Sequence, residues 1–402
     1  MRTHAERYVK LVLAMGLHDT DYVDAYYGPP EWRDEVNAKK PSLLEIHGEA
    51  TSLRNEIAQL TRPEEKLVAL RHEYLRRQLE ALLARNEILR GKKLSFDDES
   101  KALYDAVAPH HGEDYFQALN AAIDKELPGD GPLTDRVEAF RMKFVIPRDK
   151  LDAVFKAAID ACRARTLEHF ALPAGESFTV EYVTNKSWSG YNWYQGKYRS
   201  LIQVNTDLPI FIDRAIDLAC HEGYPGHHIY NTLLEQHLVN ERGWKEFSVY
   251  PLFSPQSLIA EGSANYGIDV AFPANERIEF EKRTLFPIAG LDPAQAEKYY
   301  RVQELIAKTG YAGNEAARRY LDGEITAAQA AEWLTQYALM APARAQQRVK
   351  FIDQYRSYVI NYNLGKDLVR DYVEKRSGGE AEKRWKVFEE LLSSPRLPSG
   401  LQ

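Results

Sequence analysis

The segment His221-Glu222-Gly223-Tyr224-Pro225-Gly226-His227-His228 places three histidines and a glutamate around a Pro-Gly pair. In the H-E-x-x-H motif of zinc hydrolases, two histidines four residues apart lie on one face of a helix and reach one zinc ion. Pro225 stands at that fourth position and offers no ligand atom. His227 follows two residues later, and in a regular helix its side chain would point about 240° away from that of His221. A regular helix therefore cannot bring the two rings to one ion.

Pro225 and Gly226 are the residues that would distort this helix. Pro225 has no N–H, so the carbonyl of His221 loses its helical partner and the proline ring opens the turn. Gly226 accepts the backbone angles that an irregular turn needs. Such turns, like π-bulges, are frequent at functional sites. We expect His227 to be turned back toward His221 as the second metal ligand, with His228 as the alternative.

Glu222 is the candidate general base. Because it adjoins a ligand histidine, its carboxylate would lie beside the metal ion without being forced to bind it. From there it could take a proton from the water that the metal activates and pass that proton to a leaving amine. Zinc lowers the pKa of a bound water to about 7, which makes a carboxylate base effective near neutral pH.

A catalytic zinc ion normally has three protein ligands and one open position, so a third ligand is needed. Glu261 is the best candidate, on a helix that we expect to begin at Ser254-Pro255. Small residues cluster around it and would allow close approach to the His221 helix. Asn265 shares the face of Glu261 and could orient a ligand histidine, with Asp217 as the rival for that role.

The pattern H-E-x-x-P-G-H-H, followed by an A-E-G segment, resembles that of the DUF885 proteins, which look like remote relatives of the gluzincin metallopeptidases. Residues 23–29, 96–99, 354–358 and 362–365 are also similar to segments of that family, so the resemblance covers nearly the whole chain. The sequence departs from the family at Ser263, where the usual residue is tryptophan. The resemblance implies a zinc-dependent, peptidase-like hydrolase and implies no substrate.

Helical periodicity dominates the chain and predicts a mainly α-helical protein with a central cleft. We divide it into an N-terminal helical region, 1–172, and a metal-binding region, 173–402, packed as one unit. Two β-rich runs, 178–183 and 201–206, flank a segment rich in glycine and aromatic residues and predict a short sheet beside the metal-binding helix. We expect residues 201–205 to form an edge strand that could hold an extended peptide.

Tyrosines and arginines recur on the helices of the C-terminal third. A hydrolase of this kind needs a donor for the oxyanion that develops opposite the metal, and a tyrosine or arginine suits that task. Tyr358 and Arg356 are our first candidates, with Tyr362 behind them. Arg344 or Arg348 could bind a substrate's terminal carboxylate in a bidentate manner.

Composition limits the remaining possibilities. The 402 residues carry a net charge of −7, which argues against a nucleic-acid partner. With only Cys162 and Cys220, no disulfide framework is implied, and a buried structural role is expected for Cys220. The N-terminus lacks a signal-type apolar core, and residues 11–17 are too short to span a membrane, so we expect no membrane partner and a cytoplasmic location.

These inferences lead to one principal hypothesis. His221, His227 and Glu261 bind a zinc ion, and Glu222 acts as base and acid in the hydrolysis of a peptide or related amide bond. A small-molecule amidohydrolase is the alternative within the enzymes, and would have a closed pocket. A catalytically silent peptide-binding protein is the alternative outside them, although such a protein has no use for Glu222. The oligomeric state stays open.

Overall fold

The N-terminal half of the chain is built of helices whose ends follow local sequence signals. In a computed structural model that describes residues 1–273 and 275–402, the helix α3 starts at a capping box in which Ser42 and Glu45 bond to each other's backbone N–H. The helix α4 buries Leu75, Leu79 and Leu82 on one face, as its helical period predicts. These helices are α1 (Arg2–Met15), α2 (Pro30–Lys39), α3 (Leu43–Gln59), α4 (Lys66–Leu89), α5 (Phe96–Tyr104), α6 (Glu113–Glu126), α7 (Leu133–Arg141) and α8 (Leu151–Leu167).

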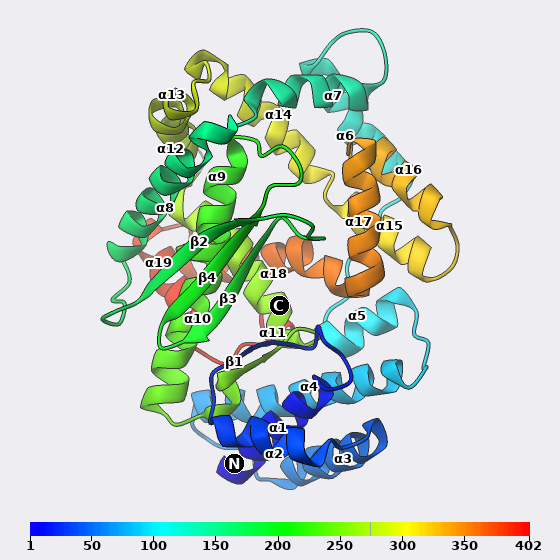
Figure 1. The fold of residues 1–402 in the computed structure, drawn as a ribbon, viewed down its shortest axis with the longest axis vertical. Helices are drawn as coiled ribbons and strands as arrows, with labels where there is room; N and C mark the ends of the chain where they lie inside the picture. The colour runs from blue at the N-terminus through cyan, green and yellow to red at the C-terminus, as the bar shows by residue number, and fades with distance from the viewer. Residues whose placement is uncertain (274) are drawn as a thin grey trace.

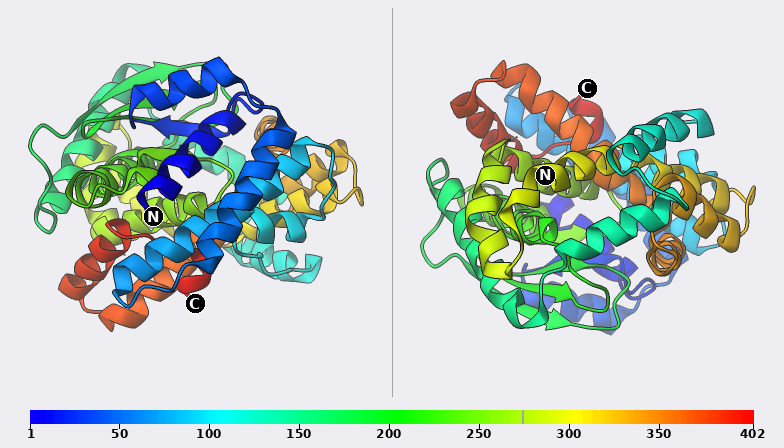
Figure 2. Two further views of the ribbon diagram at one scale, coloured as in Figure 1. Left: turned by 90° about the horizontal axis from the view of Figure 1, so that it is seen from below. Right: turned by 90° about the horizontal axis from the view of Figure 1, so that it is seen from above.

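The second half carries the histidine-containing segment 221–228 and a further set of helices. Figures 1 and 2 show α1–α4 at one end of the molecule and α7 and α13 at the other, with the sheet between them. The helices of this half are α9 (Asp213–Leu218), α10 (His227–Leu233), α11 (Pro255–Ala271), α12 (Asn275–Phe280), α13 (Phe286–Ala289), α14 (Ala296–Lys308), α15 (Tyr311–Leu321), α16 (Ala327–Tyr337), α17 (Pro342–Tyr355), α18 (Ile360–Ser377) and α19 (Ala381–Leu392). The predicted mainly α-helical fold is confirmed.

The predicted sheet lies beside the metal-binding segment, but its strand order differs from our expectation. It contains β2 (Ser177–Val183), β3 (Gly190–Gly196) and β4 (Arg199–Asn205) in the order β2-β4-β3. The strand β4 pairs in parallel with β2 and antiparallel with β3, so it is central and both its edges are occupied. The expectation that residues 201–205 form an edge strand was wrong, because β2 pairs with the second strand of the β3–β4 hairpin and leaves β2 and β3 at the edges.

A second, two-stranded sheet connects the N-terminal region to the metal-binding region. Its strands are β1 (Val23–Tyr26) and β5 (Val249–Pro251), which pair antiparallel. A buried ion pair between Arg71 and Glu246 joins the same two regions. The main apolar core also runs through both, from Tyr8 to Leu401. The division at residue 172 stays a prediction.

The two cysteines, Cys162 and Cys220, are free thiols and both are buried. In the part of the chain that the structure describes, no helix combines the length and the apolar character needed to cross a membrane.

Candidate metal centre

The chain around the histidines departs from a regular helix as the Pro-Gly pair predicted. The helix α9 continues into a π-helical turn, Ala219–Gly223, and α10 begins only at His227. Between them, Gly226 packs against the backbone of the turn, and its N–H donates to the carbonyl of Cys220 at 2.9 Å. A Cβ at this position would lie 1.9 Å from the carbonyl oxygen of His221, so only glycine fits. This close approach folds His227 back toward His221.

The side chains of His221, His227 and Glu261 converge on one point. The two Nε2 atoms of the histidines are 3.1 Å apart, and Glu261 Oε2 lies 3.3 Å from His221 Nε2 and 3.7 Å from His227 Nε2. Tetrahedral ligands at zinc–nitrogen distances of 2.0–2.1 Å would be separated by about 3.3 Å. The three separations therefore fit the face of such a tetrahedron. Among the described residues, this trio is the group of potential ligands that could hold a metal ion.

The hydrogen bonding of Glu261 also indicates a metal site. Its Oε2 atom is buried and forms no hydrogen bond, although both imidazoles lie within ion-pairing distance, whereas the neighbouring Oε1 accepts a hydrogen bond from the hydroxyl of Tyr358 at 2.7 Å. A buried acceptor without a hydrogen bond is unfavourable unless a cation compensates it. A metal cation between Glu261 and the two imidazoles would do so, and the residues present therefore fit a divalent metal ion.

Asn265 fixes the orientation of His221. Its amide nitrogen donates to the carbonyl oxygen of Tyr362 at 3.2 Å, which leaves its Oδ1 to face His221 Nδ1, also at 3.2 Å. His221 must then carry its proton on Nδ1, and its Nε2 lone pair is free for a metal ion. Asp217 does not take this role, since it pairs with Arg214 and Arg277.

His228 faces away from this trio. It is fully buried, its Nδ1 lies 2.9 Å from the hydroxyl of Ser200, and its Nε2 lies 3.1 Å from Glu176 Oε2. Of the two histidines that the sequence left open as the second ligand, His227 is the one that lies beside His221. His228 instead connects α10 to the sheet through Ser200.

Glu222 lies next to the ligand cluster but is not part of it. Its Oε1 is 4.0 Å from His221 Nε2, and its side chain is buried. Burial raises the pKa of Glu222, although the two nearby histidines act in the opposite direction. Gly190 of β3 makes room for the carboxylate, because a Cβ there would lie 2.9 Å from Glu222 Oε1. The side chain of Asn192 donates to the Glu222 carbonyl at 2.7 Å and fixes the backbone at this point.

The charges in the cluster shift one another's protonation. Burial lowers the pKa of His227, but the carboxylates of Glu261, Glu222 and Asp24 outweigh this effect and raise it to about 9. Burial likewise raises the pKa of Glu261, and the two histidines reverse that shift and hold it far below its usual range. Without a metal ion, the cluster therefore pairs an imidazolium with a carboxylate, and a metal ion would have to displace the proton.

The candidate oxyanion donors differ in their contacts and in whether they line the cleft. Tyr358 and Tyr362 both line the cleft that contains the ligand cluster. The Tyr358 hydroxyl is engaged by Glu261, whereas no described residue forms a hydrogen bond with the hydroxyl of Tyr362. Arg356 instead donates to Glu99 Oε2 at 2.7 Å and is not among the residues that line the cleft. The geometry thus gives Arg356 a contact with α5 and no contact with the cluster.

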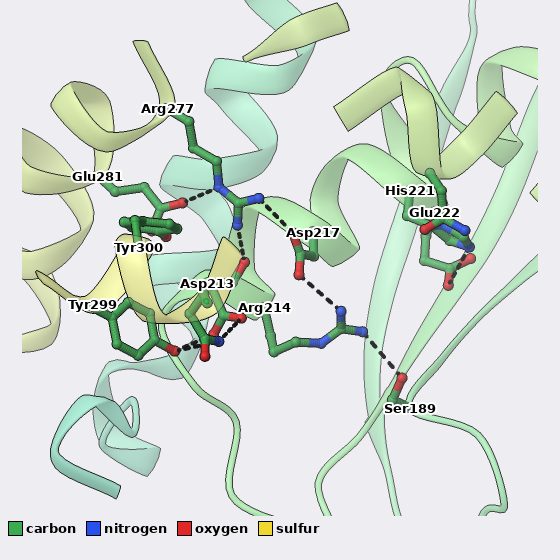
Figure 3. A network of polar contacts seen from close by, with 12 residues as sticks. Ser189, Asp213, Arg214, Asp217, His221, Glu222, Arg277, Glu281, Tyr299 and Tyr300 are labelled. Atoms are coloured by element: carbon green, nitrogen blue, oxygen red, sulfur yellow. Dashed lines mark hydrogen bonds and ion pairs between the residues drawn. The ribbon is translucent and has the colours of Figure 1, made fainter. Parts of the chain in front are cut away.

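The cleft has a volume of about 790 Å³ and is lined from both halves of the chain. One wall carries a polar network that Figure 3 shows beside His221 and Glu222. In it, Asp217 bridges Arg277 and Arg214, and Arg214 reaches the hydroxyl of Ser189 just before β3. Neither this network nor the roles of Gly190 and Asn192 were predicted from the sequence. Residues 187–196 were noted there only as a segment rich in glycine and aromatic residues.

Comparison with known proteins finds structures with a similar fold but does not assign the chain to a family. No protein-family model matches the chain, and no curated protein matches its sequence. Among solved structures, the chain is similar to a "putative lipoprotein" from Colwellia psychrerythraea, with a TM-score of 0.53 and 16% identity over 92% of this chain and 65% of that one. It therefore spans less than two thirds of the length of that protein.

Two further structures are similar at lower scores. A second lipoprotein of the same description and of unknown function, from Shewanella oneidensis, has a TM-score of 0.45 at 13% identity, over 90% of this chain and 75% of that one. Trypanosoma cruzi metallocarboxypeptidase 1 has the same TM-score and identity, over 97% and 89%. At these identities the likeness concerns the fold alone. The chain is thus a mainly helical protein with a candidate His-His-Glu metal site, and both its membership of DUF885 and its cytoplasmic location stay predictions.

Proposed function

We propose that this protein is a metal-dependent hydrolase that cleaves peptide bonds, with zinc as the preferred ion. One observation carries the proposal. The ligand atoms of His221, His227 and Glu261 have the mutual separations of a zinc site, one of them is a buried oxygen without a hydrogen-bond partner, and the carboxylate of Glu222 stands beside them. Nitrogen and carboxylate ligands favour zinc, and Mn²⁺ or Co²⁺ could replace it.

A zinc ion held there would lower the pKa of water to about 7 and polarise a substrate carbonyl. Glu222 then accepts the proton of the attacking water and delivers it to the leaving nitrogen. Its burial supports this role, because burial raises the pKa of Glu222 and so makes it a stronger base than an exposed carboxylate.

Tyr362 is our preferred donor to the oxyanion, ahead of Tyr358 and Arg356. Its hydroxyl is free of contacts with the described residues, and its backbone is held by the same asparagine that orients His221. Tyr358 is the second choice, since it would first have to leave Glu261. A donor already placed at the developing charge contributes more than one that must reorganise.

Metal content and cleavage, measured on four forms of the protein, test the proposal. The forms are the wild type and the His221→Ala, Glu222→Gln and His237→Ala variants. His237 is the matched control, because its side chain pairs with Glu241 and lies outside the cleft. We expect one zinc per chain in all forms except His221→Ala, and cleavage of a peptide library by the wild type and His237→Ala only.

The other outcomes discriminate between the alternatives. A folded wild type that binds no zinc after reconstitution would refute the metallohydrolase. Zinc bound without cleavage of any peptide or small amide would favour the silent binding protein. Cleavage of small amides alone would favour the amidohydrolase. The cleft volume of about 790 Å³ has room for a substrate of several residues, which supports the peptide substrate.

A further inference from the structure

Arg348 stands out among the cations of the cleft. It lies on α17, one helical turn after Arg344, and both side chains line the same cleft as the metal ligands. Its guanidinium lies over two aromatic rings, 4.8 Å from the centroid of Phe351 and 5.7 Å from that of Tyr362. Contacts of this kind hold the plane of a guanidinium in place while leaving its N–H groups free.

The guanidinium of Arg348 has no acidic partner within the described part of the chain. Three other cleft cations do have one, since Arg214 and Arg277 pair with Asp217, and Lys366 pairs with Asp269 at 2.7 Å. Arg141 and Arg344 also line the cleft, and both lie over the ring of Phe211. No hydrogen bond from Arg348 to a described residue accompanies its two aromatic contacts. Burial lowers the pKa of Arg348, as expected for a cation that has lost water and gained no partner. Such a group gains most from an anionic ligand.

Arg348 and Arg344 also differ in their charged neighbours. The charge of Arg348 interacts with the carboxylate of Glu261, and Tyr362, over whose ring Arg348 lies, interacts with both charges. Arg344 instead donates to the carbonyl of Pro209 at 2.7 Å, over the ring of Phe211. Its electrostatic neighbours are Arg141, Glu138, Arg214 and Asp213, none of which belongs to the ligand cluster.

We propose that Arg348 binds the free α-carboxylate of the substrate, and that the protein removes the C-terminal residue of peptides. This inference rests on the proposed function and adds the substrate class. In a peptide, successive Cα atoms are about 3.8 Å apart, so the terminal carboxylate lies one residue beyond the last peptide bond. An arginine near the metal ligands can hold that carboxylate while the adjacent bond is hydrolysed. A bidentate arginine–carboxylate pair supplies both the charge and the orientation.

The experiment compares two peptides that differ only at the C-terminus, one with a free carboxylate and one amidated. Both are offered to the zinc-loaded wild type and to the Arg348→Lys, Arg344→Lys and Arg370→Lys variants. Arg370 is the matched control, because it lies on α18 outside the cleft and pairs with Asp367 and Asp371. We expect the wild type to release the last residue of the free peptide and to leave the amide uncut.

In Arg348→Lys, kcat/KM for the free peptide should fall by about 100-fold or more, because lysine cannot reproduce the bidentate pair. The ratio of kcat/KM for the free peptide to kcat/KM for the amidated peptide should fall as well. A purely structural role for Arg348 would not change this ratio. Equal cleavage of both peptides by the wild type, or cleavage at internal bonds, would overturn the inference and leave the metallohydrolase intact. A collapsed ratio in Arg344→Lys with a normal one in Arg348→Lys would overturn the assignment to Arg348.

Binding is measured as well, so that the inference does not depend on turnover. The zinc-loaded Glu222→Gln variant is titrated calorimetrically with the two peptides, with and without the Arg348→Lys substitution. We expect the free carboxylate to bind at least about tenfold more tightly than the amide, and this preference to vanish with Arg348→Lys. Equal affinities for the two peptides would refute the role of Arg348. Failure of the protein to bind zinc would instead refute the proposed function first.

Discussion

Replacing Gly226 with alanine should destroy the metal site while changing a single methyl group. The new Cβ would lie 1.9 Å from the carbonyl oxygen of His221 and 2.4 Å from that of Cys220. Because real contacts of this kind begin near 3.0 Å, the two backbone segments must separate by about 1.1 Å. Gly226 directly precedes His227, so this movement separates one ligand from the other. Metal sites tolerate deviations of only about 0.2 Å in ligand distances.

We therefore expect Gly226→Ala to bind zinc at least about 100-fold more weakly than the wild type, a loss at the upper end of that seen for substitutions behind a ligand. Zinc affinity by competition with a chelator gives the first measurement, and the thermal shift on adding zinc gives the second. At a zinc concentration 100 times its Kd, the wild type should gain about 2.7 kcal/mol of stability. The variant should gain almost none.

The control is Gly48→Ala, on α3, where an added Cβ meets nothing within 4 Å. This substitution in the middle of a helix should stabilise the protein by about 0.5–1 kcal/mol and leave zinc binding unchanged. If Gly226→Ala folds and binds one zinc per chain with wild-type affinity, the reasoning is refuted. The close packing of Gly226 against the π-helical turn would then not be what brings His227 to His221.

Three further predictions follow from contacts around the site. Asn265→Leu removes the acceptor that orients His221 and should weaken zinc binding by about 10- to 100-fold, whereas Asn265→Asp should restore most of it; both are measured by chelator competition. Gly365→Ala places a Cβ 2.8 Å from the carbonyl of Leu258 and should cost about 1–3 kcal/mol in urea unfolding of the metal-free protein, and an unchanged midpoint would contradict this. Burial raises the pKa of Glu176, but His228, Tyr224 and Arg163 outweigh it and lower that pKa from 4.5 to about 2. A carboxyl group whose pKa is lower in the folded state stabilises the protein above about pH 4.5, and this stability disappears as the pH falls toward about 2. Glu176→Gln should therefore lower the free energy of unfolding by about 2–3 kcal/mol at neutral pH and by progressively less in acid. Urea unfolding of the metal-free protein measures this as well.

Local sequence signals were sufficient for the helices and for the metal-binding turn. Helical periodicity predicted a mainly α-helical chain, and α3, for example, spans Leu43–Gln59 from a capping box formed by its own first residues. The Pro-Gly pair predicted an irregular turn, and a π-helical turn is present at Ala219–Gly223. In both cases the physical cause lies within a few residues of its effect, so no knowledge of the tertiary structure was needed.

Contacts between distant segments were not predictable in the same way. Glu99 and Arg356 were each noted in the sequence, but nothing in it indicated that they bond to each other across 257 positions. The position of β4 at the centre of the sheet depends on its parallel pairing with β2, which is set by packing rather than by the strand's own residues. The small residues around Glu261 were expected to allow close approach to the His221 helix. Gly267 packs against Pro225 of that segment, whereas Gly262 packs against the backbone of Gly365, where a Cβ would lie 2.4 Å away.

The packing of α11 against α18 positions the side chains that these two helices contribute to the cleft. The contact between Gly262 and Gly365 lets α11 and α18 approach more closely than larger residues would permit. Asn265, on the same α11, then reaches across to the carbonyl of Tyr362 on α18 while its own oxygen faces His221. One asparagine thus sets the proton position on a candidate metal ligand and anchors the backbone of the candidate oxyanion donor. Because both contacts depend on one side chain, a shift of α18 relative to α11 would disturb the candidate ligand and the candidate donor together.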